Sequence, residues 1–97
     1  MNCDSYEIFF RNFSNKTKFD IIMTLRNKPL SVNALVKILG EEQSKVSHSL
    51  AHLAKCGILN VKKDGKKRIY SLNRETILPI IALVEKHVEK HCTGRCR

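Results

Sequence analysis

The dipeptide Asp64-Gly65 constrains this chain more than any other feature, because two short β-prone runs flank it. The runs are ILNVKK before it and KRIYSL after it. Asp-Gly is typical of two-residue hairpin turns, in which both central positions take positive φ. We therefore predict a β-hairpin with Asp64 and Gly65 at its tip. Five cationic side chains surround that tip: Lys62, Lys63, Lys66, Lys67 and Arg68.

Two short helical segments precede this hairpin and are separated by a tight turn. The first, LSVNALVKILG, has Ser31 as its predicted cap and Gly40 as its end. The second, EEQSKVSHSLAHLAKCG, closes at Gly57. The predicted buried side chains of the two helices are Leu35, Ile38, Leu39, Val46, Leu50 and Leu53. Two short helices across a Gly-containing turn are the signature of a helix-turn-helix.

Three more helices are predicted outside this pair. DSYEIFFRNFSN places Tyr6, Phe9, Phe10 and Phe13 on one stripe at spacings of three and four. SNKTKFDIIMTLRNKPL follows, with Ser14 or Asn15 as its cap and a buried face of Phe19, Ile22, Met23 and Leu25. The last helix is expected to start near Ile77 or in an earlier kinked turn, since Pro79 is tolerated only in a first turn, and to end at His91.

These elements together predict a mainly α fold with a small β-hairpin, the winged helix-turn-helix. Its 97 residues make a single domain, because so short a chain cannot divide its apolar surface between two cores. We expect residues 14–73 to form the core, residues 1–13 and 74–92 to form dimerisation helices, and residues 93–97 to form a tail. Dimerisation is expected because the two terminal helices carry more apolar surface than a monomer of this size can hide.

The charge balance favours a polyanionic partner. The sequence holds 18 Lys and Arg against 9 Asp and Glu, a formal net charge of +9. The longest apolar run, residues 77–84, contains Pro79 and is far too short for a membrane span, and no secretory signal is visible. We therefore expect a cytoplasmic protein that binds nucleic acid. An enzyme is not expected, because Ser44, His48 and His52 share one short helix without a third orienting group.

The outward face of the helix after Gly40 is the predicted base-reading surface. With Val46 at the centre of the buried stripe, Ser44 and His48 fall on the opposite face. Five polar side chains cluster toward the start of this helix, where a recognition helix meets bases: Gln43, Ser44, Lys45, Ser47 and His48. Gln43 and Lys45 are the expected base readers. The hairpin cations are expected to lie along phosphates, where they add affinity with little direct sequence readout.

A stretch of about sixty residues resembles the winged-helix core of the ArsR/SmtB family of bacterial and archaeal repressors. The matching pieces are Lys16-Thr17-Lys18 before IIMTL, then LSVNALVKILG, QSKVSHSLAHLAKCGIL and DGKKRIYSL. The resemblance implies a homodimer, joined through its first and last helices, on a double-stranded operator with two-fold symmetry. It also implies that an inducer releases the protein from that operator.

Histidines and cysteines recur at spacings that allow two ligands to reach one metal ion. His52 and Cys56 are four residues apart, His87 and His91 repeat that spacing, and Cys92 and Cys96 follow in the tail. The resemblance places His52 and Cys56 where one subgroup of the family has two thiolates. Zinc or another thiophilic transition metal is thus the expected regulatory ion. Alternatives stay open: Cys56 as a small core residue, a Cys92–Cys96 redox pair, or a frayed tail.

The sequence as a whole predicts a sequence-specific DNA-binding transcriptional regulator, a homodimeric repressor released from its operator by metal binding. The alternatives are a constitutive or thiol-redox-responsive winged-helix regulator, and a winged-helix protein-interaction module. Interaction modules usually lose the basic hairpin, which this chain keeps.

Overall fold

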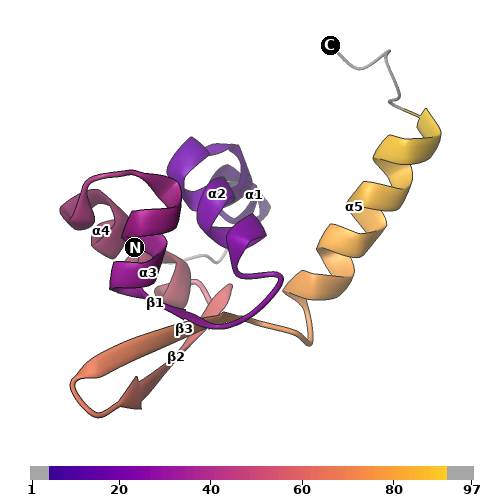
Figure 1. Ribbon diagram of the computed structural model, residues 1–97. Helices are drawn as coiled ribbons and strands as arrows, with labels where there is room; N and C mark the ends of the chain where they lie inside the picture. The colour runs from indigo at the N-terminus through magenta and orange to yellow at the C-terminus, as the bar shows by residue number, and fades with distance from the viewer. Residues whose placement is uncertain (1–4, 92–97) are drawn as a thin grey trace.

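The computed structural model describes residues 5–91 and has the predicted winged helix-turn-helix architecture. Along the chain its elements are α1 (Tyr6–Ser14), α2 (Lys16–Thr24), β1 (Leu30–Ser31), α3 (Val32–Leu39), α4 (Gln43–Lys55), β2 (Leu59–Asp64), β3 (Lys67–Leu72) and α5 (Ile77–His91). Helices α1 to α4 form one group, the β2–β3 hairpin projects from it, and α5 stands to one side (Figure 1). No helix within residues 5–91 is long and apolar enough to span a bilayer.

Local capping explains where the helices begin and end. Asn15 separates α1 from α2, and its side chain accepts a hydrogen bond from the backbone N–H of Lys18 at 3.0 Å. Ser31 caps α3 through the N–H of Ala34 at 3.2 Å, as predicted. Gly40 ends α3 with φ at 66°, a left-handed conformation that glycine adopts without steric cost, so this prediction is also confirmed.

The sheet contains a strand that the sequence did not reveal. Its order is β1-β3-β2, all antiparallel, and the two-residue β1 pairs Leu30 with Tyr70 and Ser31 with Ile69. This third strand ties the start of α3 to the hairpin. Periodicity could not reveal it, because two residues are too short to establish an alternating pattern.

The hairpin tip lies one residue later than predicted. Asp64 pairs with Lys67 as the last rung of the ladder, so the two loop residues are Gly65 and Lys66. Gly65 has φ at 65°, and no non-glycine residue of the described chain has positive φ. Positive φ at the first central position alone is the pattern of a type II′ turn, so the expected Asp64-Gly65 centre is wrong.

A single apolar core joins α2, α3, α4, the hairpin base and the start of α5. Its fully or nearly fully buried members are Ile21, Ile22, Leu25, Leu35, Val46, Leu50, Leu53, Ile58, Leu59, Tyr70, Leu72, Ile77 and Ile81. Two predicted core residues are wrong: Phe19 is 41% exposed and Ile38 is 58% exposed. In α2 the buried face follows Thr17, Ile21 and Leu25 at spacings of four, and the polar Thr17 at its head disguised that stripe.

Candidate nucleic-acid interface

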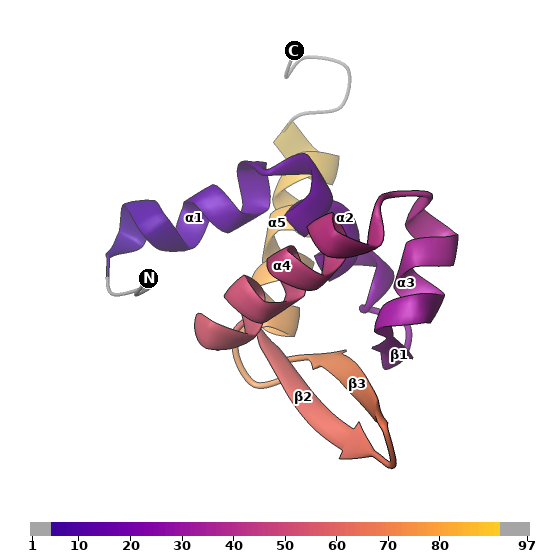
Figure 2. The ribbon, with the colours of Figure 1, turned by 90° about the vertical axis from the view of Figure 1, so that its left-hand side faces the viewer.

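Helix α4 presents one polar face to solvent and buries the other. Val46, Leu50 and Leu53 are completely buried against the rest of the fold (Figure 2 shows α4 among its neighbours). On the outward side Gln43, Ser44, Lys45 and His48 are exposed, and Ser47 is half-buried. The five predicted base-reading residues therefore all lie within the first two turns of α4.

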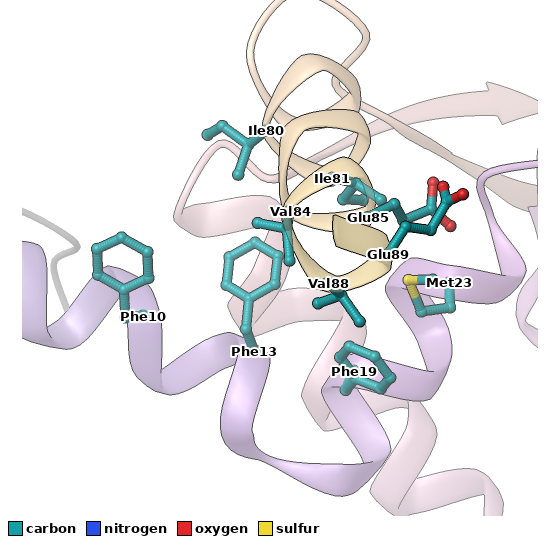
Figure 3. A pocket seen from close by; sticks show the side chains of 10 residues that line it. All are labelled: Phe10, Phe13, Phe19, Met23, Ile80, Ile81, Val84, Glu85, Val88 and Glu89. Carbon is teal, nitrogen blue, oxygen red and sulfur yellow. The ribbon is translucent and has the colours of Figure 1, made fainter. Parts of the chain in front are cut away.

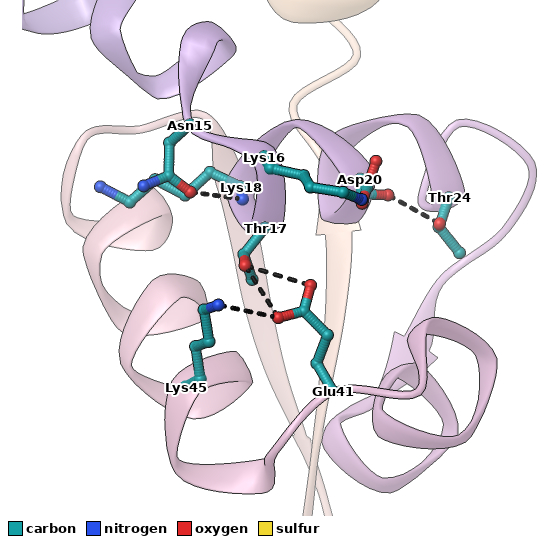
Figure 4. Close-up of polar contacts among 8 residues, drawn as sticks. All are labelled: Asn15, Lys16, Thr17, Lys18, Asp20, Thr24, Glu41 and Lys45. Carbon is teal, nitrogen blue, oxygen red and sulfur yellow. Dashed lines mark hydrogen bonds and ion pairs between the residues drawn. The ribbon is translucent and has the colours of Figure 1, made fainter.

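The Glu41 carboxylate organises the start of α4. It accepts hydrogen bonds from the hydroxyl of Thr17, at 3.1 Å to each oxygen, and it pairs with Lys45 Nζ at 3.1 Å (Figure 4). Hydrogen bonds from Lys45 and then Thr17 lower the pKa of the Glu41 carboxyl below its ordinary value. Glu41 thus links the buried Thr17, in the first turn of α2, to the exposed face of α4.

A second carboxylate of the same turn holds Ser44, another residue of the predicted base-reading surface. Ser44 Oγ donates to Glu42 Oε1 at 2.5 Å. Within residues 5–91, by contrast, the side chains of Gln43 and His48 make no hydrogen bond or ion pair. The side chains of Gln43 and His48 are therefore free of carboxylate contacts within the described residues. Lys45 and Ser44 must first break their contacts with Glu41 and Glu42.

The wing formed by β2, β3 and their turn is a continuous cationic surface. The five predicted cations Lys62, Lys63, Lys66, Lys67 and Arg68 are all exposed. The register pairs Lys63 directly with Arg68 across the two strands, an arrangement of like charges that costs stability. No ion pair neutralises any of the five among the described residues. A ridge of this kind is suited to an anionic polymer.

His52 and Cys56 lie one turn apart at the end of α4, but each already has another partner. Lys18 Nζ hydrogen-bonds to His52 Nδ1. Burial, and then the nearby charge of Lys18, lower the pKa of His52, which favours the neutral imidazole. Cys56 is disulfide-bonded. The other three cysteines of the chain, Cys3, Cys92 and Cys96, lie outside the described residues.

His87 and His91 come together near the end of α5. Their ring centroids are 4.8 Å apart on the exposed side of the helix. The structure does not join them to His52 and Cys56, since no group of three or more His, Cys, Asp or Glu side chains within residues 5–91 is placed to hold a metal ion. The predicted tail ligands Cys92 and Cys96 lie beyond the described part of the chain. The described residues therefore supply two imidazoles there and no complete metal site.

Comparison with known proteins places the chain in a family. A family model described as the arsR family of bacterial regulatory proteins matches residues 15–61, from the cap of α2 into β2. The HTH-type transcriptional regulator MJ1325 of Methanocaldococcus jannaschii is 30% identical over 78 residues, which make up 79% of this chain and 88% of that protein.

The chain belongs to the arsR family.

Two further relatives of this arsR-family chain come from Mycobacterium tuberculosis. The HTH-type transcriptional regulator NmtR is 42% identical over 52 residues, 54% of this chain and 43% of NmtR. The regulator KmtR is 26% identical over 72 residues, 74% of this chain and 55% of KmtR. The chain thus spans about half the length of these two curated relatives.

Solved structures support the same family fold. M. tuberculosis Rv0081 superposes with a TM-score of 0.81 at 26% identity, over 92% of this chain and 90% of that one. The AntR antimony-specific transcriptional repressor superposes with a TM-score of 0.71 at 25% identity, over 86% and 76% of the two chains. The arsR-family winged helix predicted from the sequence is therefore confirmed.

Sequence reasoning missed Thr17 and Glu41 as parts of the candidate interface. The spacing of Glu41 and Lys45 was a visible signal, because residues four apart on or next to a helix lie side by side. The contact of Thr17 with Glu41 joins residues 24 apart in the sequence, and no local sequence pattern predicts it.

Proposed function

We propose that this arsR-family chain is a homodimeric, sequence-specific transcriptional regulator that binds double-stranded DNA through α4 and the wing. The observation that carries the proposal is the exposed polar face of α4 followed by a wing of five unneutralised cations. A helix of this width fits the major groove, and a basic hairpin beside it fits the phosphate backbone. The names of MJ1325, NmtR and KmtR as HTH-type transcriptional regulators support it.

The roles divide by side-chain chemistry. Gln43 can accept from and donate to one base edge, and His48 and Ser47 can each make a single hydrogen bond to another. Lys45 and Ser44 reach DNA once a base or phosphate replaces the carboxylates of Glu41 and Glu42 as their partners. The wing residues Lys62, Lys63, Lys66, Lys67 and Arg68 contact phosphates and set the salt dependence of binding.

The homodimer is proposed from the apolar surface of the terminal helices. Exposed apolar side chains of α1 and α5 include Tyr6, Phe10, Leu83, Val84 and Val88. Of these, Phe10, Val84 and Val88 line a cavity of about 680 Å³ between α1, α2 and α5, across which Val84 and Val88 face Phe13 and Phe19 (Figure 3). A second subunit that covers this surface by two-fold symmetry places two α4 helices on one DNA face, about 34 Å apart.

The DNA-binding proposal is tested by selecting duplexes from a random pool with the full chain and then comparing two variants. Gln43→Ala should lower affinity for the selected duplex about tenfold, and affinity for a random duplex by less than twofold. Lys63→Ala should weaken both equally and reduce the slope of log affinity against log salt. Failure to enrich any duplex would reject the proposal and favour a protein-interaction module.

We further propose repression relieved by a thiophilic transition metal, with His87 and His91 as ligands from the described residues. AntR, an antimony-specific transcriptional repressor of the same fold, supports a metal or metalloid input. A bound ion would supply charge and a rigid link at the end of α5. Zinc titration of the reduced protein should release the selected duplex, and His87→Ala with His91→Ala should prevent that release. Unchanged release by the variant would remove these two residues from the site.

Thiol oxidation is a second candidate input, favoured by the disulfide at Cys56. This residue caps the C-terminal end of α4, where its backbone N–H bonds to His52 O at 3.1 Å. Oxidation there would change how the end of the proposed recognition helix is held. Affinity for the selected duplex should then differ between oxidised and reduced wild-type protein, and Cys56→Ser should abolish the difference. Equal affinities in the two states would exclude this input.

A further inference from the structure

Within residues 5–91, helix α5 is buried against the rest of the molecule only at its beginning. Ile77 and Ile81 are buried in the common core, whereas every residue in 82–91 is exposed. At 1.5 Å per residue, this outer part is an arm of about 15 Å. The cavity of about 680 Å³ separates it from α1 and α2, so side-chain packing does not fix its direction.

One ion pair crosses from the body to this arm. Arg26, just after α2, donates from Nη1 to Glu85 Oε2 and from Nη2 to Glu85 Oε1, each at 2.7 Å. Among the described residues, no other side-chain hydrogen bond or ion pair joins residues 82–91 to α1–α4 or the sheet. Glu85 is one turn beyond the buried Ile81, so the contact lies at the base of the exposed arm.

The bidentate geometry fixes the orientation of the Arg26 guanidinium against the Glu85 carboxylate as well as the distance between them. Two parallel bonds between a planar guanidinium and a planar carboxylate resist rotation of one group against the other, which a single ammonium cannot do. Arg26 is 30% exposed and Glu85 is 47% exposed, so the pair is partly shielded from solvent. A bidentate arginine contact is the kind of surface pair that contributes measurably.

We propose that the Arg26–Glu85 pair is a positioning contact that sets the angle of α5 against the winged helix and, through it, the separation of the two recognition helices in the dimer. This inference rests on the proposed function. In a dimer joined through α5, any rotation at the base of the arm is carried to the partner's α4. The pair then matters for a duplex that engages both subunits and hardly at all for one that engages a single subunit.

The chain offers a matched control at Glu75, two residues before α5. This exposed carboxylate does not line the cavity and, within residues 5–91, its side chain makes no hydrogen bond or ion pair. Glu75→Gln therefore removes the same charge from near the base of α5 and leaves the positioning contact intact. It separates a general electrostatic effect on DNA binding from the loss of the contact.

The test uses two duplexes derived from the pool selected by the wild-type protein: one with both half-sites and one with a half-site scrambled. Glu85→Gln and Arg26→Lys should each lower affinity for the two-half-site duplex about five- to tenfold. Their affinity for the scrambled duplex should stay within about twofold of wild type. Glu75→Gln should match wild type on both duplexes. The charge exchange, Arg26→Glu with Glu85→Arg, should recover most of the lost affinity.

Three results would overturn the positioning role: equal losses on both duplexes, the same loss in Glu75→Gln, or no recovery in the charge exchange. Circular dichroism melting of each variant shows whether the winged helix is intact, and an intact variant with wild-type affinity for both duplexes also overturns it. If the wild-type protein enriches no two-fold symmetric duplex, the proposed function fails first, before any variant is compared.

Discussion

At the scale of single residues, Glu41 decides how the polar face of α4 is presented before any partner arrives. It holds Lys45 by an ion pair and is itself held by the hydroxyl of the buried Thr17. Lys45 is thereby kept close to the protein surface in a preferred direction. We infer that its release is coupled to the approach of an anion, because a phosphate can take the place of the carboxylate.

The lowered pKa of Glu41 predicts a pH dependence of stability. A carboxyl whose folded pKa is depressed stabilises the fold fully above its ordinary pKa of 4.5 and loses that contribution as pH falls through the folded pKa. Urea midpoints measured from pH 6 downward should therefore fall less steeply for Glu41→Gln than for wild type. The wild-type midpoint should exceed that of the variant near pH 6, and the two should converge at low pH.

The control for this measurement is Glu42→Gln. It removes an equal charge from the same turn but leaves the contact of Glu41 with Thr17 and Lys45 in place. The Glu42→Gln midpoint should follow the wild-type slope with pH. If both variants flatten the curve equally, the effect belongs to net charge and not to the Glu41 contacts.

At the scale of elements, the wing depends on a turn that only glycine forms without strain. Gly65 has φ at 65° and open space around the position of a Cβ atom, so a substitution there meets backbone strain and no steric clash. Gly65→Ala should lower the free energy of unfolding by about 1 kcal/mol, and Gly65→Asn should lower it by less, because asparagine visits positive φ more readily. Thermal melting of the three proteins checks the order. An alanine variant as stable as wild type would contradict the turn assignment.

Most of the helices and strands could be predicted from interactions between residues close in the sequence. The features that could not be predicted depend on contacts between distant residues. The caps at Ser31 and Gly40, the start of α5 at Ile77 and the stripe of α4 follow from neighbours along the chain. The tip of the hairpin shifted because strand register is set by the pairing of Val61 with Tyr70 and its neighbours, which no dipeptide encodes.

The candidate site likewise has features that the sequence predicts and features that it does not. Exposure of Gln43, Ser44, Lys45 and His48 followed from helical periodicity, and the charge of the wing followed from the sequence around its turn. The contacts of Thr17 with Glu41, Lys18 with His52 and Arg26 with Glu85 join residues 24, 34 and 59 apart in the sequence. Only the folded chain brings these groups together, so their spacing in the sequence does not predict the contacts.

At the scale of the whole molecule, the unevenly distributed apolar surface is the main argument for a second subunit. The core of the winged helix is closed, but apolar side chains remain on α1 and α5 around one cavity. Because the charged wing and α4 belong to a different part of the chain, covering this cavity leaves the proposed DNA-binding surface available. A compact dimer with both wings free is the arrangement that satisfies both surfaces at once.

This arrangement predicts that one charged side chain at the apolar surface separates the subunits. Val84 is 54% exposed and lines the cavity, so Val84→Lys should place an ammonium in the covered interface and shift the protein to monomer. Ile38→Lys is the matched control, because Ile38 is 58% exposed on α3 and does not line the cavity. Sedimentation velocity should find a monomer for Val84→Lys and a dimer for wild type and Ile38→Lys.

The same pair of variants links subunit contact to DNA binding. A monomer engages one half-site at a time, so Val84→Lys should lose about a hundredfold in affinity for the two-half-site duplex. Its affinity for a single half-site should stay near that of wild type, because α4 and the wing are untouched. A dimeric Val84→Lys protein, or equal dissociation of Ile38→Lys, would place the interface elsewhere. Helix α5 would then not set the spacing of the two recognition helices.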